Sequence, residues 1–127
     1  MGEPTVARRL ERRFILMTSD VAIGERLRAA MPGDWQMNVV QNLEDVGDWS
    51  DILLYRFILI DLDTTQDFDP VEVMRELRTG YLLQTAVFCF GGDAALRDEM
   101  RMNRADRFFE RDEIVTRLGS FLQQYGW

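Results

Sequence analysis

Carboxylate, hydroxyl and glycine residues follow the apolar runs of this sequence, at positions where chemistry is commonly placed. The residues after successive runs are Thr18, Ser19 and Asp20, then Asp61 and Asp63, then Gly91 and Gly92, and finally Glu110. Carboxylates are ligands for hard divalent cations and, with a metal ion and a cation nearby, acceptors of phosphoryl groups. A Gly-Gly pair before a helix can present main-chain N–H groups to an anion. The same residues also serve as ordinary strand ends, caps and turns, and both interpretations stay open.

Several kinds of site are excluded by residue types that the chain lacks. It contains no histidine and no lysine, since all 15 basic residues are arginine, and it has one cysteine, Cys89. Histidine-based triads, histidine-ligated metals, Schiff-base lysines and multi-cysteine zinc sites are therefore ruled out. Cys89 lies inside an apolar run and is expected to be an inert core residue. We expect a chain that is not an enzyme, with no cofactor and no metal site, although Asp20, Asp61 and Asp63 together keep a divalent ion as an alternative.

The charge pattern bears on partners and location. A net charge of −7 argues against nucleic acid as the main partner. Residues 1–13 are rich in arginine, whereas residues 44–72 hold nine acids against Arg56 alone, which indicates either partner recognition by charge or a solvated face. No apolar run is long enough for a membrane helix. The start of the sequence has no apolar segment typical of a secretory signal, so we expect a cytoplasmic protein without membrane contact.

Apolar runs alternate with helical spacing along most of the chain. Strands are predicted at 14–17, 35–40, 57–60, 86–90 and 108–109. Helices are predicted after Asp20, after Asp69-Pro70, after Asp93 and over 114–122, while 43–55 is ambiguous. The pattern predicts an α/β fold: a flavodoxin-like, doubly wound, five-stranded parallel sheet of order 2-1-3-4-5 with helices on both faces. We expect residues 13–127 to form the domain and residues 1–12 to form an N-terminal appendage.

This topology places the candidate residues together. The carboxyl ends of parallel strands meet at one edge of the sheet, where such folds bind ligands. The predicted core includes apolar residues from three strands and the last helix: Ile15, Leu16, Ile58, Leu59, Val87, Phe88 and Leu118.

With these elements in place, the chain resembles the receiver domain of two-component response regulators over roughly residues 12–126. The segment 57–63, Phe-Ile-Leu-Ile-Asp-Leu-Asp, is similar to the third strand of that family, and Asp61 stands at the position of the phosphoacceptor aspartate. The resemblance implies a protein that takes part in signalling through protein partners.

The rest of the family's active site is not matched. The acidic pair that holds magnesium in receivers is replaced by Thr18 and Ser19, with Asp20 next. The hydroxyl residue at the end of the fourth strand falls on Phe90 or Gly91, and the lysine after the fifth strand falls on Glu110. A carboxylate at that place would repel a transferring phosphoryl group instead of offsetting its charge.

The resemblance therefore points to a degenerate receiver, or pseudo-receiver. We expect a stand-alone signalling module for protein–protein interaction, without normal magnesium-dependent phosphorylation. The alternative is a phosphoacceptor response regulator that uses Asp61 by an atypical mechanism. A flavodoxin-like cofactor binder is less consistent with the sequence, because no Ser/Thr-rich phosphate loop follows the first strand.

In working receivers, partners or a second copy commonly bind the face of the fourth helix, fifth strand and fifth helix. The corresponding region here mixes many arginines with acids, and its predicted interface residues are Arg97, Met100, Arg101, Met102, Arg104 and Phe109. Arginine is well suited to interface carboxylates, and the apolar members would form the centre of the patch. We expect a homodimer or a heterologous signalling partner on this face; a solvated surface of a monomer is the alternative.

Overall fold

The computed structural model describes residues 11–124, so all but the last two residues of the predicted appendage lie outside the described part of the chain. In chain order the elements are β1 (Arg13–Met17), α2 (Val21–Ala30), β2 (Gln36–Val40), η1 (Leu43–Asp45), α3 (Trp49–Ile52), β3 (Phe57–Asp61), α4 (Pro70–Arg75), η2 (Glu76–Gly80), β4 (Ala86–Phe90), α5 (Ala94–Met102), β5 (Arg107–Phe109) and α6 (Arg111–Gln124). The alternation of strand and helix agrees with the prediction.

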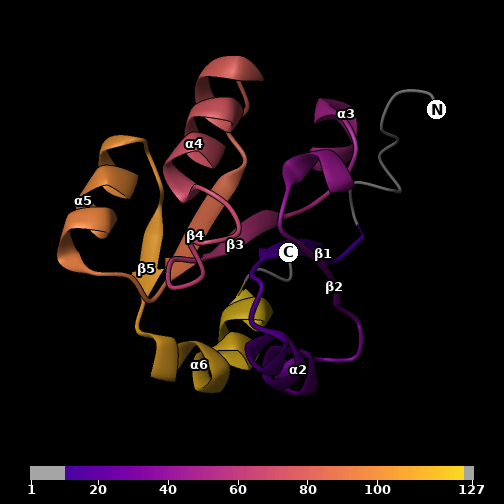
Figure 1. The fold of residues 1–127 in the computed structure, drawn as a ribbon. Helices are drawn as coiled ribbons and strands as arrows, with labels where there is room; N and C mark the ends of the chain where they lie inside the picture. The colour runs from indigo at the N-terminus through magenta and orange to yellow at the C-terminus, as the bar shows by residue number, and fades with distance from the viewer. Residues whose placement is uncertain (1–10, 125–127) are drawn as a thin grey trace.

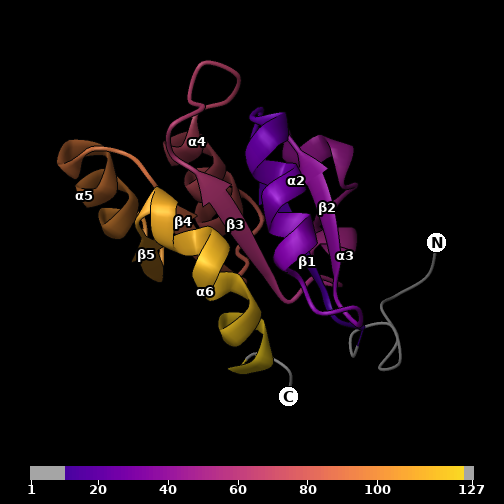
Figure 2. The same ribbon diagram turned by 90° about the horizontal axis from the view of Figure 1, so that it is seen from below.

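The five strands form one parallel sheet in the order β2-β1-β3-β4-β5, which confirms the predicted fold. Helices α2 and α6 cover one face, and α3, α4 and α5 cover the other (Figures 1 and 2). Every residue of β3 is buried, as expected for a central strand covered on both faces. The carboxyl ends of β1, β3 and β4 therefore meet at one edge of the sheet.

The face under α2 and α6 is packed with aromatic rings. The rings of Phe14 and Phe57 stack at 4.8 Å, and Phe121 of α6 meets Phe57 edge-on at 5.7 Å. Leu118 is fully buried in the same cluster, and the other predicted core residues are buried as well. This packing determines where α6 lies on the sheet, and thereby where its first residue, Arg111, stands.

Aspartates begin three of the helices, as predicted. Asp20, Asp69 and Asp93 each accept a hydrogen bond from a main-chain N–H of the first helical turn. The ambiguous segment 43–55 contains only two short pieces, η1 and α3. Gly47 stands between them with φ of +134°, which explains why the apolar spacing there does not produce one continuous helix.

A buried arginine joins two loops at the other end of the sheet, where the strands β4 and β5 begin. Arg78 lies in η2, the π-helical continuation of α4, and its side chain is 5% exposed. Its Nη1 donates to the carbonyl oxygens of Leu83 at 2.9 Å and Thr85 at 2.8 Å, and its Nη2 donates to that of Arg104 at 3.1 Å. One side chain thus connects the loop before β4 with the loop before β5.

Candidate functional site

The guanidinium of Arg111 stands at the centre of the carboxylates that follow β1 and β3. Its Nη1 lies 2.7 Å from Oδ1 of Asp61 and 3.1 Å from Oδ2 of Asp63, and its Nη2 lies 2.6 Å from Oδ2 of Asp20. The structure therefore brings together the three acids that the sequence placed at this edge. It adds a cation that the sequence analysis did not assign to them.

Asp61 is fully buried, and both of its carboxylate oxygens are engaged. The hydroxyl of Thr18 donates to Oδ2 at 2.7 Å, while the main-chain N–H of Asp63 donates to Oδ1 at 2.8 Å beside the Arg111 contact. Thr18 is itself buried, and its oxygen accepts from the main-chain N–H of Asp20 at 3.0 Å. These contacts satisfy the buried charge of Asp61 with protein groups alone.

Asp20 has two tasks, which both favour its ionised form. It caps α2 by accepting from the N–H of Ile23, and this hydrogen bond, followed by the contact with Arg111, lowers its pKa. Partial burial alone would lower the pKa of Arg111, but hydrogen bonds and attraction from Asp61 and its neighbours raise it above the ordinary value. Arg111 is therefore charged at every pH at which the domain is folded.

The Gly91-Gly92 turn belongs to the same cluster. The N–H of Gly92 donates to Oδ1 of Asp63 at 2.9 Å, so an internal carboxylate takes the place that an external anion would use. Gly91 has φ of +75°, and a Cβ there would stand 2.0 Å from Oδ2 of Asp63. The pair is a turn that admits Asp63, which agrees with its interpretation as a turn.

Glu110 is not where the family comparison placed it. Its carboxylate is exposed and accepts from Nη1 of Arg97 at 3.1 Å, away from Asp61. Arg97 is held in turn by the carbonyl oxygens of Gly91 at 2.8 Å and Phe109 at 3.3 Å. The expectation that a carboxylate replaces the cation of the pocket is wrong, because the next residue, Arg111, supplies the positive charge.

Ser19 lies in the turn between β1 and α2, where its N–H donates to Oγ1 of Thr64 at 3.4 Å. Its place is consistent with the turn interpretation of Thr18-Ser19.

The residues present do not fit a magnesium ion at this position. Asp20, Asp61 and Asp63 each direct a carboxylate oxygen at one guanidinium, which occupies the space between them. Over residues 11–124 no group of three or more acidic or cysteine side chains is arranged to hold a metal ion. The three carboxylates bind the guanidinium of Arg111 in the place where a metal ion would have to lie.

The predicted interface on α5, β5 and α6 needs a correction. Met100 is 0% and Phe109 is 4% exposed, so they belong to the core and cannot form the apolar centre of a docking patch. Met102, at 83% exposed, is the one apolar residue of that set that reaches the surface. The guanidinium of Arg97 binds Glu110 and the carbonyl oxygens of Gly91 and Phe109 within the domain. The physical reason is helical spacing: Met100 is four residues after Leu96 and faces inward with it.

The single cysteine of the chain lies in β4, in the core of the sheet. Cys89 is fully buried, and burial raises the pKa of its thiol to about 12, which confirms an inert core residue. None of the helices in the described part of the chain is both long enough and apolar enough to span a membrane.

Solved structures of other proteins share this fold. No protein-family model matches the sequence, and no curated protein matches it. The structure is similar to a response regulator receiver protein from Pseudoalteromonas atlantica, with a TM-score of 0.65 and 15% identity over 88% of this chain and 93% of that one. It is also similar to a response regulator signal receiver domain from Bermanella marisrubri, with a TM-score of 0.63 and 22% identity over 84% and 93% of the two chains. The chain has the fold of receiver domains.

Proposed function

We propose that this chain is a degenerate receiver that acts as a protein–protein interaction module in signalling, and that magnesium-dependent phosphorylation does not switch it. The observation that carries this proposal is the contact of Arg111 with Asp61, 2.7 Å from Nη1 to Oδ1, on a carboxylate with no exposed surface.

The geometry opposes phosphoryl transfer to Asp61 for two reasons. An attacking carboxylate oxygen needs an open line of approach, whereas Asp61 has no exposed surface and protein donors contact both of its oxygens. The transferred group also brings negative charge. Three carboxylates and one guanidinium give the cluster a formal charge of −2, from −3 and +1, and this net charge disfavours more of the same sign.

The same contacts favour one constant conformation. Arg111 links the start of α6 to the ends of β1 and β3, and Asp63 extends the link to the Gly91-Gly92 turn. A divalent ion or phosphoryl group would need to displace these bonds before it could change the surface. A partner therefore meets the same surface with or without a phosphodonor.

The alternative function is a phosphoacceptor that uses Asp61 by an atypical mechanism. The observation in its favour is again Arg111, because a cation next to Asp61 is what phosphoryl transfer requires. This route needs the Arg111 side chain, which is 30% exposed, to swing away from Asp61 and then pair with the phosphoryl oxygens.

Intact-protein mass spectrometry after incubation with acetyl phosphate and magnesium separates the two functions. We expect no added phosphoryl group on the wild-type chain. Asp61→Asn provides the control for modification elsewhere, and Arg111→Gln shows whether freeing Asp61 permits the reaction. Near-complete phosphorylation of the wild type that disappears in Asp61→Asn would establish the alternative.

The interaction half of the proposal is tested by co-purification from the native cell with and without acetyl phosphate. We expect the same partner in equal amounts under both conditions. A partner that is retained only with the phosphodonor would contradict a module with one constant surface.

A further inference from the structure

Among the described residues, 11–124, no strand pairs with the outer side of β2, which is an edge strand of the sheet. The N–H of Gln36 donates to the carbonyl of Arg12 at 2.8 Å, and the carbonyl of Val40 accepts from Thr18 at 3.3 Å. Main-chain N–H and C=O groups of successive residues point to alternate sides of a strand. Those of Gln36, Asn38 and Val40 therefore point toward β1. The N–H and C=O groups of Met37 and Val39 therefore point away from the sheet.

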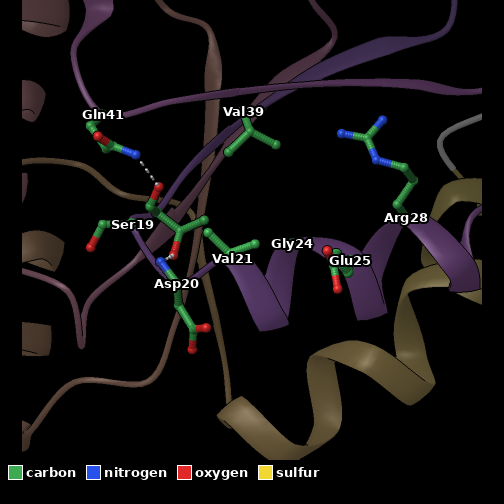
Figure 3. A pocket seen from close by; sticks show the side chains of 9 residues that line it. Ser19, Asp20, Val21, Gly24, Glu25, Arg28, Val39 and Gln41 are labelled. Atoms are coloured by element: carbon green, nitrogen blue, oxygen red, sulfur yellow. Dashed lines mark hydrogen bonds between the residues drawn. The ribbon is translucent and has the colours of Figure 1, made fainter.

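A groove of about 210 Å³ runs between this edge and α2. One side is a stripe of α2 at helical spacing, formed by Val21, Gly24, Glu25 and Arg28, and Val39 stands across from it (Figure 3). Val21 is 74% exposed and Val39 is 38% exposed. A Cβ placed on Gly24 would meet no atom within 4 Å, so the wall of the groove is open there.

The two edges of the sheet differ in how they are protected. Natural edge strands usually carry charges or proline, or are very short. At the other edge, β5 has three residues and Arg107, whose guanidinium lies 4.8 Å from the ring centre of Phe109. β2 has five residues, Gln-Met-Asn-Val-Val, with no charge and no proline. Its main chain is thus a template for another extended strand.

We propose that two copies of this chain pair through β2, antiparallel, about a two-fold axis at Asn38. In this register Met37 of each copy lies opposite Val39 of the other. The outward N–H and C=O groups of both pairs then exchange hydrogen bonds, as directly opposed residues of an antiparallel pair do. Met37 and Val39 share one face of the sheet, and Val39 of each copy adds its apolar side chain beside the groove of the other.

The charges on α2 fit a second copy. Glu25 and Arg28 are both exposed, and neither side chain makes an ion pair within the described residues. A two-fold axis reverses one α2 relative to the other, which places Glu25 of each copy toward Arg28 of its mate. Charge of both signs on one rim is self-complementary, and this favours an identical chain over an unrelated strand. Such rim pairs set register more than affinity.

Sedimentation equilibrium from low micromolar to near-millimolar concentration tests the proposal. We expect a monomer–dimer equilibrium in the full chain. Val39→Lys places a charge at the pairing edge, and Val39→Pro removes an outward N–H while leaving the hydrogen bonds to β1 intact. Each variant should raise the dimer dissociation constant at least tenfold. Amide exchange at Met37 and Val39 should slow as the wild-type concentration rises.

Met102→Lys is the matched control, since it makes the same apolar-to-lysine change at an exposed residue on α5 and leaves β2 untouched. It should dimerise like the wild type. A chain that is monomeric throughout the range overturns the proposal, as does a dimer that survives Val39→Lys or dissociates in Met102→Lys. Thermal unfolding of each variant verifies that the fold is retained. None of these readouts depends on Asp61, so the result is independent of the phosphorylation experiment.

Discussion

Two arginines, one at the carboxyl ends of the strands and one at their amino ends, hold the loops of this protein in different ways. Arg111 is bound by three carboxylates and is 30% exposed. Arg78 is 5% exposed and is bound by three main-chain carbonyl oxygens, with the Asp106 carboxylate more distant at 3.5 Å. Each joins segments that are far apart in the sequence, yet only Arg111 stands among the carboxylates that follow β1 and β3.

The difference separates an arginine held mainly by neutral carbonyl groups from one held by carboxylates. Burial lowers the pKa of Arg78, and its Nε has no partner in the described structure, so its charge is costly and is tolerated for the carbonyl contacts it makes. Arg111 instead balances negative charge that would otherwise attract a cation. Removing Arg78 should therefore damage the fold, whereas removing Arg111 should expose a latent affinity for cations.

The largest effect is expected for Arg78→Met, which keeps the length of the side chain but removes the donors. The carbonyl groups of Leu83, Thr85 and Arg104 would lose the donors of a buried side chain, so the free energy of unfolding should fall by about 3–5 kcal/mol. Urea unfolding followed by circular dichroism measures the change. Arg75→Met, one turn earlier and exposed, is the control and should change stability by less than about 0.5 kcal/mol. Equal effects of the two variants would remove the distinction.

Arg111→Ala is expected to cost about 1–3 kcal/mol, less than Arg78→Met because the cluster is partly solvated. Three carboxylates without a counter-charge repel one another, so magnesium or calcium should restore part of the lost stability by binding the folded state. Unfolding midpoints with and without each ion report this. The wild type and Arg117→Ala, which breaks an exposed pair with Glu113, should not respond. An Arg111→Ala variant indifferent to both ions would show that Arg111 does not replace a ligand.

Gly91→Ala probes the turn that receives Asp63. The positive φ and the 2.0 Å approach to the Asp63 carboxylate both oppose a side chain, so we expect a loss of about 1–2 kcal/mol. Gly24→Ala makes the same chemical change in the interior of α2, where no atom is close, and should stabilise by about 0.5 kcal/mol. Thermal unfolding of the two variants should therefore shift in opposite directions. A shift of the same sign would indicate that the Asp63 contact is dispensable.

The smallest effect is expected from the titration of Asp20. Its pKa is lowered in the folded state from an ordinary value of 3.8, so its contribution is present at neutral pH and is lost as the pH falls through the folded pKa. Asp20→Asn retains the helix cap and removes the charge. The stability of the wild type should fall more steeply below pH ~4 than that of the variant, by no more than about 0.5 kcal/mol because the Asp20 side chain is 36% exposed and solvent screens its charge. Identical pH profiles would contradict this role.

The sequence was sufficient for the fold because its local signals agree. The apolar runs and the capping aspartates before α2, α4 and α5 all predict the same alternation, and the resulting topology gathers Asp20, Asp61 and Asp63 at one edge. Arg111 was missed because Glu110, one residue earlier, matches the family's lysine in order. α6 starts directly after Glu110, and the long side chain of its first residue reaches back across the edge of the sheet.

Tertiary contacts explain why the sequence misplaced Met100 and Phe109 on the surface and did not reveal the burial of Arg78. Met100 and Phe109 lie among many charged residues, and the charge pattern suggested a surface, but the four-residue spacing from Leu96 to Met100 was the stronger signal. Nothing near Arg78 in the sequence distinguishes it from exposed arginines. Its partner Arg104 is 26 residues away, so only the assembled loops reveal its burial.

The buried cysteine of β4 offers a direct measure of how often the sheet opens. Cys89 is the only thiol of the chain and has no exposed surface. A thiol with a pKa of about 12 reacts negligibly while the protein is folded, so labelling must pass through an opened state in which β4 meets water. When reclosing is fast, the rate of modification in native buffer reports the population of that state. Cys89 is thus a native probe of the opening of the sheet, and no residue has to be introduced to measure it.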